Sequence, residues 1–394
     1  HSCFFTDALM DLVKSGAVTN RRKGVWLGKS VTSYALGTSE LMVWLNRNPL
    51  VEFQGIDKVN DPLQIGRNRR FVAILPARKV DVSGRVALHF GKGNVIAGPG
   101  EAMDYIIGAN LSEGGRIMFA LPSRNRKGWP NVRISVDEYP NQFNMRESVD
   151  MVVTEFGVAN LKGRSIRERA QALIEIAHPD DRLDLVNKAK EANILYKDQI
   201  FLAESAHLYP SEISSRQTFK GGIDVRFRVI KPSDEEGMRR LFYRFSDEAV
   251  YYRYFSPIKA MPHNKMQSYV NVDFNQVMSI VGMVGDPGEE KIIAEARFVK
   301  DRHQPYGDVA FVVDEAYQGL GIGSYLLRML VRLAKDKGLN GFTADVLASN
   351  KGMMKVFEKS GLSFKTQLES GAFHLMISFE EDASKPAPTL EYSN

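Results

Sequence analysis

Three glycines at alternate positions form the part of this sequence that is best suited to bind an anion. They lie in the stretch Gln318-Gly319-Leu320-Gly321-Ile322-Gly323-Ser324, between an apolar run at residues 309–313 and a leucine-rich segment at residues 325–334. Glycine tolerates a positive φ and lets a ligand approach the main chain. If a helix follows, its first N–H groups and its dipole attract the same anion. The stretch therefore predicts an anion site, and a tight turn chosen only for packing is the alternative.

The segments around these glycines predict the elements that hold them. Residues 309–313 are a continuous apolar run typical of a buried strand, and Leu326, Leu327 and Leu330 recur at helical spacing. A second strand is predicted at residues 342–347 and a second helix at residues 350–359. The chain as a whole mixes short strands and helices, which predicts an α/β or α+β fold.

Composition narrows the class of protein. A length of 394 residues predicts two or three domains, and 44% hydrophobic with 25% charged residues is ordinary for a globular protein. The net charge of +5 is too small to indicate nucleic-acid binding. The cluster Arg21-Arg22-Lys23 suits a phosphate, although a solvated loop explains such clusters more often. No apolar run approaches the roughly 20 residues that span a bilayer, so no membrane span is expected.

The cysteine and histidine content gives no support for a metal. Cys3 is the single cysteine, and the seven histidines are scattered without a ligand-like spacing. The chain begins at His1 rather than Met, so we expect it to be the downstream part of a longer polypeptide. No secretory signal is visible in the numbered residues, and a cytoplasmic location is expected.

The N-terminal half carries a family resemblance. Residues 152–164, Val-Val-Thr-Glu-Phe-Gly-Val-Ala-Asn-Leu-Lys-Gly-Arg, followed by Ile176-Ala177-His178-Pro179, resemble the C-terminal half of the acetyl-CoA hydrolase/transferase family. The resemblance covers about residues 1–195 and implies a CoA-transferase-like α/β domain. The family's nucleophile is a glutamate in a His-Ser/Thr-Glu segment, whereas His1-Ser2 is followed here by Cys3. Cysteine lacks the carboxylate that forms the family's mixed anhydride.

A second departure lies in the family's glycine-glycine-glutamine turn, which here is Gly98-Pro99-Gly100-Glu101-Ala102. We therefore hypothesise a degenerate transferase half, kept as a scaffold or as an acyl-CoA sensor. Under the alternative interpretation of Cys3, it is an ordinary buried thiol. Acetyl-CoA hydrolase or acetate CoA-transferase activity in this half is the alternative function.

The second half resembles the GNAT acyltransferases. Residues 225–379 follow the order of that family: a strand, a Gln-x-x-Gly-x-Gly turn, a helix, a strand, Asn350 and a helix. Within GNAT proteins, residues 246–255, Ser-Asp-Glu-Ala-Val-Tyr-Tyr-Arg-Tyr-Phe, resemble bacterial protein lysine acetyltransferases. The predicted organisation is a transferase-like domain at 1–195, a linker at 196–223, a GNAT mixed-sheet domain with flanking helices at 224–380 and a flexible tail at 381–394.

This resemblance implies roles for named residues. The acyl arm of acetyl-CoA would lie between the two strands, along Val312 and Val313, with Asn350 on its pantetheine side. Related enzymes place a glutamate just before the first of these strands, where this sequence has Asp308, so Asp308 is the candidate base acting through a water; capping the strand end is its alternative role. Phe357 stands where many relatives have a tyrosine, so no general acid is assigned. The CoA pyrophosphate would be held by the backbone around Gln318, Gly319, Leu320, Gly321, Ile322, Gly323 and Ser324.

Taken together, these residues predict an acetyl-CoA-dependent N-acetyltransferase. The expected acceptor is an amine, with a protein lysine as the main candidate. Acetyl-CoA or CoA is the only expected cofactor, used as co-substrate and without a metal. The expected partners are acyl-CoA and a protein lysine, in a bacterial cytoplasm, and a homo-oligomer is left open.

Overall fold

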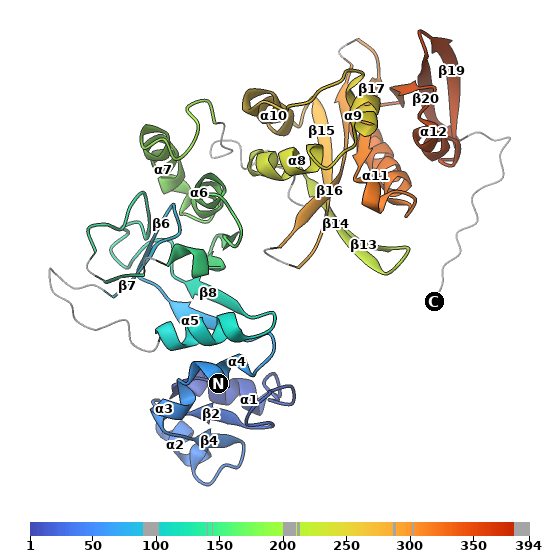
Figure 1. Ribbon diagram of the computed structural model, residues 1–394. Coiled ribbons are helices and arrows are strands. Elements are labelled where there is room, and N and C mark those ends of the chain that lie inside the picture. Colours follow the sequence, from blue (N-terminus) through green and yellow to red (C-terminus); the bar gives the residue numbers. More distant parts are fainter. Residues whose placement is uncertain are drawn as a thin grey trace. The chain divides into compact units, whose positions relative to one another are not determined.

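The protein is described by the computed structural model in Figure 1 over residues 1–89, 102–139, 141–143, 145–199, 210, 213–286, 289–301 and 303–381. It divides into two compact units, His1–Lys197 and Asp198–Asn394. The predicted departure at Gly98 to Glu101 and the predicted flexible tail beyond Glu381 lie outside the described residues. The predicted domain bounds stay predictions.

The first unit mixes short strands with helices. Its helices are α1 (Asp7–Lys14), α2 (Ser39–Leu45), α3 (Ile56–Val59), α4 (Pro62–Gly66), α5 (Ala102–Leu111), α6 (Ile166–Glu175) and α7 (Pro179–Glu191). Its strands are β1 (Phe4–Phe5), β2 (Ser30–Thr32), β3 (Tyr34–Ala35), β4 (Val51–Phe53), β5 (Val72–Pro76), β6 (Lys79–Asp81), β7 (Val86–His89), β8 (Arg116–Ala120), β9 (Val132–Arg133), β10 (Asn141–Phe143), β11 (Met151–Thr154) and β12 (Gly157–Asn160).

Two four-stranded sheets organise this unit, in the orders β12-β11-β8-β5 and β10-β7-β6-β9. In the first, β5, β8 and β11 run parallel, and β12 returns antiparallel along β11. Helix α5 packs against β5 and β8, as Figure 1 shows in cyan. Ser165 starts α6 with a capping box that includes Glu168, which gives the helix a fixed beginning.

The second unit is built on one large sheet. Its strands are β13 (Ser214–Phe219), β14 (Ile223–Val229), β15 (Val277–Val284), β16 (Lys291–Lys300), β17 (Tyr306–Val313), β18 (Gly341–Leu347), β19 (Leu362–Glu369) and β20 (Ala372–Glu381). Its helices are α8 (Glu235–Phe242), α9 (Asp247–Tyr254), α10 (His263–Val270), α11 (Ile322–Asp336) and α12 (Lys351–Glu358).

The strand order is β13-β14-β15-β16-β17-β18-β20-β19, and one neighbouring pair differs from the others. All neighbours are antiparallel except β17 and β18, which run parallel. These two strands pair only from Tyr306 opposite Gly341 to Asp308 opposite Thr343. Both strands continue beyond that point, to Val313 and Leu347, with no further β17–β18 pair among the described residues. The sheet therefore opens between them toward their C-terminal ends.

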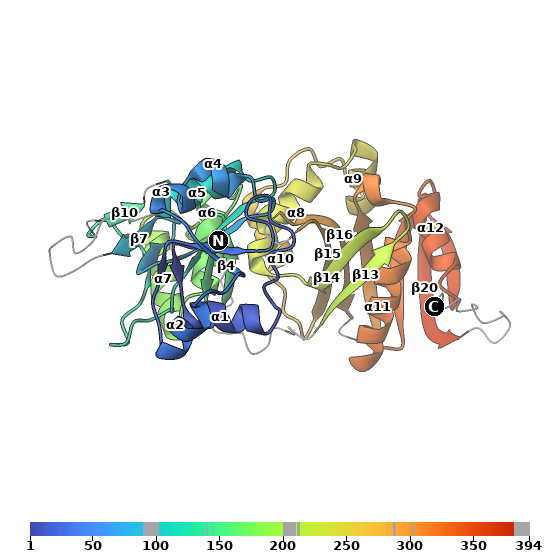
Figure 2. The ribbon, with the colours of Figure 1, turned by 90° about the horizontal axis from the view of Figure 1, so that it is seen from below.

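Helices cover both faces of this sheet. On one face, α11 and Phe357 of α12 pack against Val309 and Phe311 of β17 in a single apolar core. On the other face, α8, α9 and α10 enclose a second core with Met283 and Ile292. Figure 2 shows α8 and α10 on one side of strands β14–β16 and α11 on the other. The predicted mixed α/β architecture with flanking helices is confirmed.

One strand of the large sheet lies in a stretch where the sequence pattern predicts none. Strand β13 falls inside the predicted linker at 196–223, yet it pairs along its whole length with β14. Its sequence, Ser-Ser-Arg-Gln-Thr-Phe, is polar because an edge strand is mostly exposed, so it lacks the apolar alternation by which strands are recognised.

Candidate functional site

A cavity of about 810 Å³ lies at the opening between β17 and β18. It is lined by residues of α9, which covers one face of the sheet, and by residues of α11 and α12, which cover the other. The cavity therefore crosses the sheet through the gap between the two parallel strands. Main-chain groups at such a gap lack ladder partners and need water or a ligand instead.

Most of the predicted site residues lie in the walls of this cavity. The exception is Leu320, which packs against the apolar core of the sheet. The predicted residues in the walls are Asp308, Val312, Val313, Gln318, Gly319, Gly321, Ile322, Gly323, Ser324 and Asn350.

The glycine turn begins α11 with exposed main chain. Gly319 and Gly321 have φ of 75° and 98°, whereas Gly323 is an ordinary helical residue. Gly321 is the N-cap, and no side chain caps the helix there. The N–H groups of Ile322, Gly323 and Ser324 have no partner within the helix because they belong to its first turn. These groups and the helix dipole suit a phosphate at the cavity wall.

Two predicted polar residues also hold the local backbone. The Gln318 amide donates to the Val313 carbonyl at 3.1 Å, which joins the turn to the end of β17. The Asn350 side chain accepts from the Met353 N–H at 3.1 Å and so caps α12. Both side chains therefore shape the cavity as well as lining it.

Asp308 lies at the last paired position before β17 and β18 separate. It is an exposed residue on the face that α9 covers. Although Asp308 stays open to solvent, the cavity walls displace part of the water around its carboxyl. This partial loss of hydration, followed by the negative charge of Asp345, raises the pKa of Asp308 above its ordinary value, and Arg253 acts in the opposite direction. A carboxylate with a raised pKa is a stronger proton acceptor once ionised.

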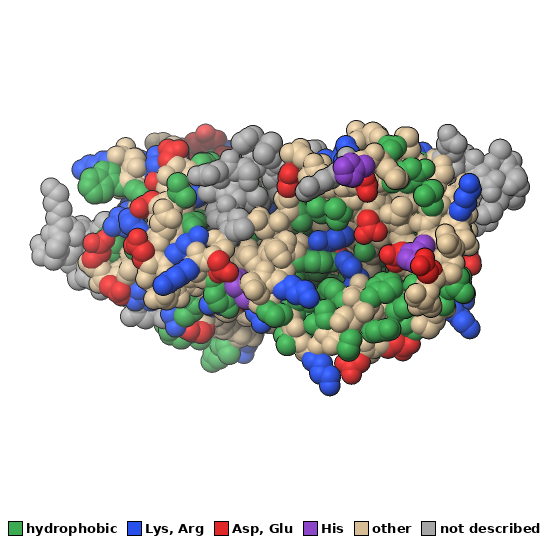
Figure 3. Space-filling view, turned by 90° about the horizontal axis from the view of Figure 1, so that it is seen from above, with side chains coloured by type: hydrophobic (Ala, Val, Ile, Leu, Met, Phe, Trp, Pro, Cys, Tyr) green, Lys and Arg blue, Asp and Glu red, His purple; other side chains and the backbone are tan. Residues whose placement is uncertain are grey.

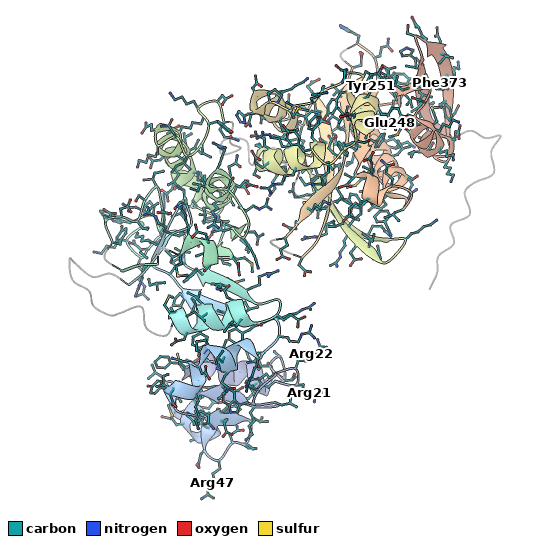
Figure 4. The ribbon with its side chains drawn as sticks, in the orientation of Figure 1. Arg21, Arg22, Arg47, Glu248, Tyr251 and Phe373 are labelled. Atoms are coloured by element: carbon teal, nitrogen blue, oxygen red, sulfur yellow. The ribbon has the colours of Figure 1, made fainter. Side chains whose placement is uncertain are left out.

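Residues that sequence reasoning did not select form an acidic wall beside Asp308. Asp345 lies two residues beyond Thr343 on β18, lines the cavity and bonds His374 of β20. From α9, Glu248 also lines the cavity and accepts a hydrogen bond from Tyr252. Figure 4 labels Glu248 on this helix. The spacing of four residues between Glu248 and Tyr252 is visible in the sequence, but the position of Asp345 follows only from the sheet register.

A buried ionic cluster lies next to this acidic wall and reaches it through Arg253 of α9. Glu295 is 0% exposed and accepts from Arg297 at 2.6 Å, from Ser279 at 2.7 Å and from Tyr269 at 2.8 Å. Arg253 of α9, which lines the cavity, donates to the Tyr269 hydroxyl of α10. The cluster thus connects α9 and α10 to β16, and removing a partner would leave a buried charge uncompensated.

The structure describes Cys3 and the basic cluster at Arg21 and Arg22, both in the first unit. Cys3 is buried at 7% exposure, which favours the interpretation as an ordinary buried thiol. Arg21 and Arg22 are exposed, as Figure 4 shows, in keeping with a solvated loop.

Within the described ranges, no helix is both long and apolar enough to cross a bilayer. The same ranges hold no group of three or more His, Cys, Asp or Glu side chains arranged around a metal.

Two family models match the chain. Residues 37–189 match the acetyl-CoA hydrolase/transferase C-terminal domain, and residues 240–362 match the acetyltransferase (GNAT) family. The chain joins an acetyl-CoA hydrolase/transferase C-terminal domain to a GNAT domain. Both resemblances predicted from the residues are thereby confirmed.

Similar proteins match one domain each. Over 193 residues the chain is 42% identical to 4-hydroxybutyrate coenzyme A transferase of Clostridium kluyveri, covering 48% of this chain and 45% of that protein. Over 136 residues it is 35% identical to acetyltransferase Pat of Mycolicibacterium smegmatis, covering 34% of this chain and 40% of that protein. The chain therefore spans less than half the length of either relative. The crystal structure of the GNAT domain of S. lividans PAT is 28% identical, with a TM-score of 0.40, over 43% of this chain and 99% of that one.

The glycine turn of the GNAT domain gives a paired stability prediction. Gly321→Ala should lower the free energy of unfolding by about 1 kcal/mol, because a Cβ disfavours the left-handed backbone. Gly323→Ala should leave it unchanged or raise it by up to about 1 kcal/mol, because alanine favours a helix. The added Cβ would meet Val356 at an ordinary 3.5 Å. Urea unfolding followed by circular dichroism measures both; a larger loss in Gly323→Ala than in Gly321→Ala would contradict the assignment.

The acidic wall of the GNAT domain gives a second prediction. Asp345→Asn should lower the pKa of Asp308 toward the ordinary value of about 3.9, because it removes one neighbouring negative charge. The shift should be incomplete, since loss of hydration is the larger cause. Carbon-13 NMR of labelled aspartate carboxyls reports this pKa directly. Asp336→Asn, at the exposed end of α11, is the matched control, and an equal shift in both variants would show that Asp345 has no specific effect.

Proposed function

We propose that the GNAT domain transfers an acetyl group from acetyl-CoA to an amine. The observation that carries this proposal is the cavity that crosses the sheet where β17 and β18 separate. One opening presents the N–H groups of the glycine turn, which suit a pyrophosphate, and the opposite opening presents Asp308. A thioester donor and an amine acceptor can therefore enter from opposite faces and meet within the sheet.

The acceptor proposed is a lysine of another protein. Glu248, Asp308 and Asp345 give the acceptor side of the cavity an acidic lining, which attracts an ammonium group. The side chain of a lysine is long enough to place its amine in a gap while the rest of the protein stays outside. The relative named acetyltransferase Pat supports the transferase activity, and a bacterial cytoplasm would supply both substrates.

The proposed reaction removes two protons from the acceptor nitrogen, one before the attack and one after it. A lysine amine has a pKa of about 10.4 and arrives protonated. Asp308, ionised, accepts the first proton through a water, and the neutral amine then attacks the thioester carbon. The C–N bond forms as the C–S bond breaks, and the sulfur leaves as the CoA thiolate. The nitrogen, which is cationic after the attack, releases its second proton to water and becomes the neutral amide. No general acid is assigned, because the buried Phe357 occupies the expected position and a thiolate leaves without one.

Asp308→Asn should lower kcat by about 100-fold or more, because general base catalysis contributes at least that factor. The affinity for acetyl-CoA should stay unchanged, since the donor contacts lie on the other side of the gap. In the wild type, activity should fall as pH drops through the raised pKa of Asp308, because the protonated carboxyl cannot accept a proton. Labelled acetyl transfer to candidate proteins, with modified lysines identified by mass spectrometry, measures the rate. Wild-type turnover in Asp308→Asn would remove Asp308 from the mechanism, and Asp336→Asn serves as the control.

The N-terminal domain carries the second candidate function, CoA transfer or acetyl-CoA hydrolysis, because the similar 4-hydroxybutyrate coenzyme A transferase matches it. Its residues favour a supporting role instead. Cys3 offers no carboxylate for an anhydride. The Glu155 carboxylate already accepts from the Ser123 N–H at 2.8 Å and from the Ser123 hydroxyl at 2.6 Å, so it holds the local structure together. We propose a scaffold or acyl-CoA sensor. Exchange of labelled acetate into acetyl-CoA by the whole chain would restore the transferase function.

A further inference from the structure

Three lysines stand in a row on one wall of the cavity in the GNAT domain. Lys351, Lys355 and Lys359 follow one another at intervals of four residues, from the first residue of α12 to its C-cap. Side chains four residues apart lie on the same face of a helix, so the row is about 12 Å long. All three residues are exposed, and all three line the cavity.

None of these lysines has a carboxylate partner within the part of the chain that the structure describes. Like charges four residues apart destabilise a helix by a few tenths of a kcal/mol per pair. Elsewhere in the described chain, lysines with nearby acids do form pairs, as Lys188 does with Asp184 at 2.7 Å. The row on α12 is therefore a concentration of uncompensated positive charge, which an anion in the cavity would relieve.

The row lies beside the glycine turn. Helices α11 and α12 are in contact, and a Cβ on Gly323 would lie 3.5 Å from Val356, the residue between Lys355 and Phe357. The acidic residues Glu248 and Asp308 line the other side of the same cavity. Figure 3 shows this unit in the right half of the view, with basic and acidic side chains close together near its centre. The lysines of α12 thus place positive charge beside the first turn of α11, where a phosphate would bind. Glu248 and Asp308 place negative charge on the side where the amine would enter.

We propose that Lys351, Lys355 and Lys359 form a subsite for the 3′-phosphate of CoA. This subsite rests on the proposed function, in which the first turn of α11 holds the pyrophosphate. The 3′-phosphate is a separate monoester that carries a charge of about −1.5 to −2 near neutral pH. Backbone N–H groups of one helix turn cannot serve both groups, whereas lysines act as mobile point charges for the second. The row thus selects CoA over carriers that lack the 3′-phosphate.

Calorimetric titration of the whole chain with CoA and with 3′-dephospho-CoA tests the subsite. The wild type should bind CoA about tenfold more tightly, since each exposed lysine–phosphate pair contributes about two- to fivefold at low salt. Lys355→Gln should reduce this preference by about two- to fivefold and leave the affinity for dephospho-CoA unchanged. Replacing all three lysines by glutamine should bring the preference close to one. The wild-type preference should also weaken as salt is added, because exposed charges are screened.

Lys335→Gln is the matched control, because Lys335 is an exposed lysine of α11 outside the cavity wall. It should keep the full preference for CoA. A wild-type preference near one, or an equal loss of affinity for both ligands in Lys355→Gln, overturns the subsite. If CoA binds without this preference, the proposed acetyl transfer still stands; if neither ligand binds, both proposals fall. A preserved preference without acetyl transfer to any amine leaves the subsite standing and overturns the proposed function.

Discussion

The separation of β17 from β18 is the constraint on which the candidate site depends. Backbone pairing between them stops at Asp308 and Thr343, while each strand stays paired with its outer neighbour. The sheet therefore keeps its cores on both faces and still offers a passage with unpaired main-chain groups. An amide-bearing ligand arm can complete the hydrogen bonds that the missing ladder would have made.

This passage also explains how two kinds of charge share one cavity. The helices on one face contribute the glycine turn and the lysine row of α12, and α9 on the other face contributes Glu248. Asp308 and Asp345 reach that second face because side chains alternate along a strand. Under the proposed function, an anionic donor and a cationic acceptor would thereby be attracted to opposite openings and ordered before any bond forms.

The sequence predicted the elements whose patterns are local. Helix α11 follows from its leucine spacing, the turn from its glycines, and α12 from the GNAT-like order of strand, Asn350 and helix. The edge strand β13 was missed because its exposed residues show no apolar alternation. The edge strand β19 does alternate, with Leu362, Phe364 and Leu368 between polar residues, and was overlooked. The Asp345–His374 pair depends on the register between β18 and β20, and the Glu295 cluster joins α9, α10 and β15 to β16. Such contacts have no local signal. Helix α9 lies within the segment that resembles lysine acetyltransferases. Helices α9 and α10 have eight residues each, which is too short for a helical period to be recognised in the sequence.

A crystal structure of the whole chain with bound acetyl-CoA tests the central claim most directly. We expect the pyrophosphate against the N–H groups of Gly321 to Ser324, and the thioester in the gap between β17 and β18 with its acyl end toward Asp308. Acetyl-CoA bound only within residues 1–197, or bound in the second domain with the gap empty, would contradict this account.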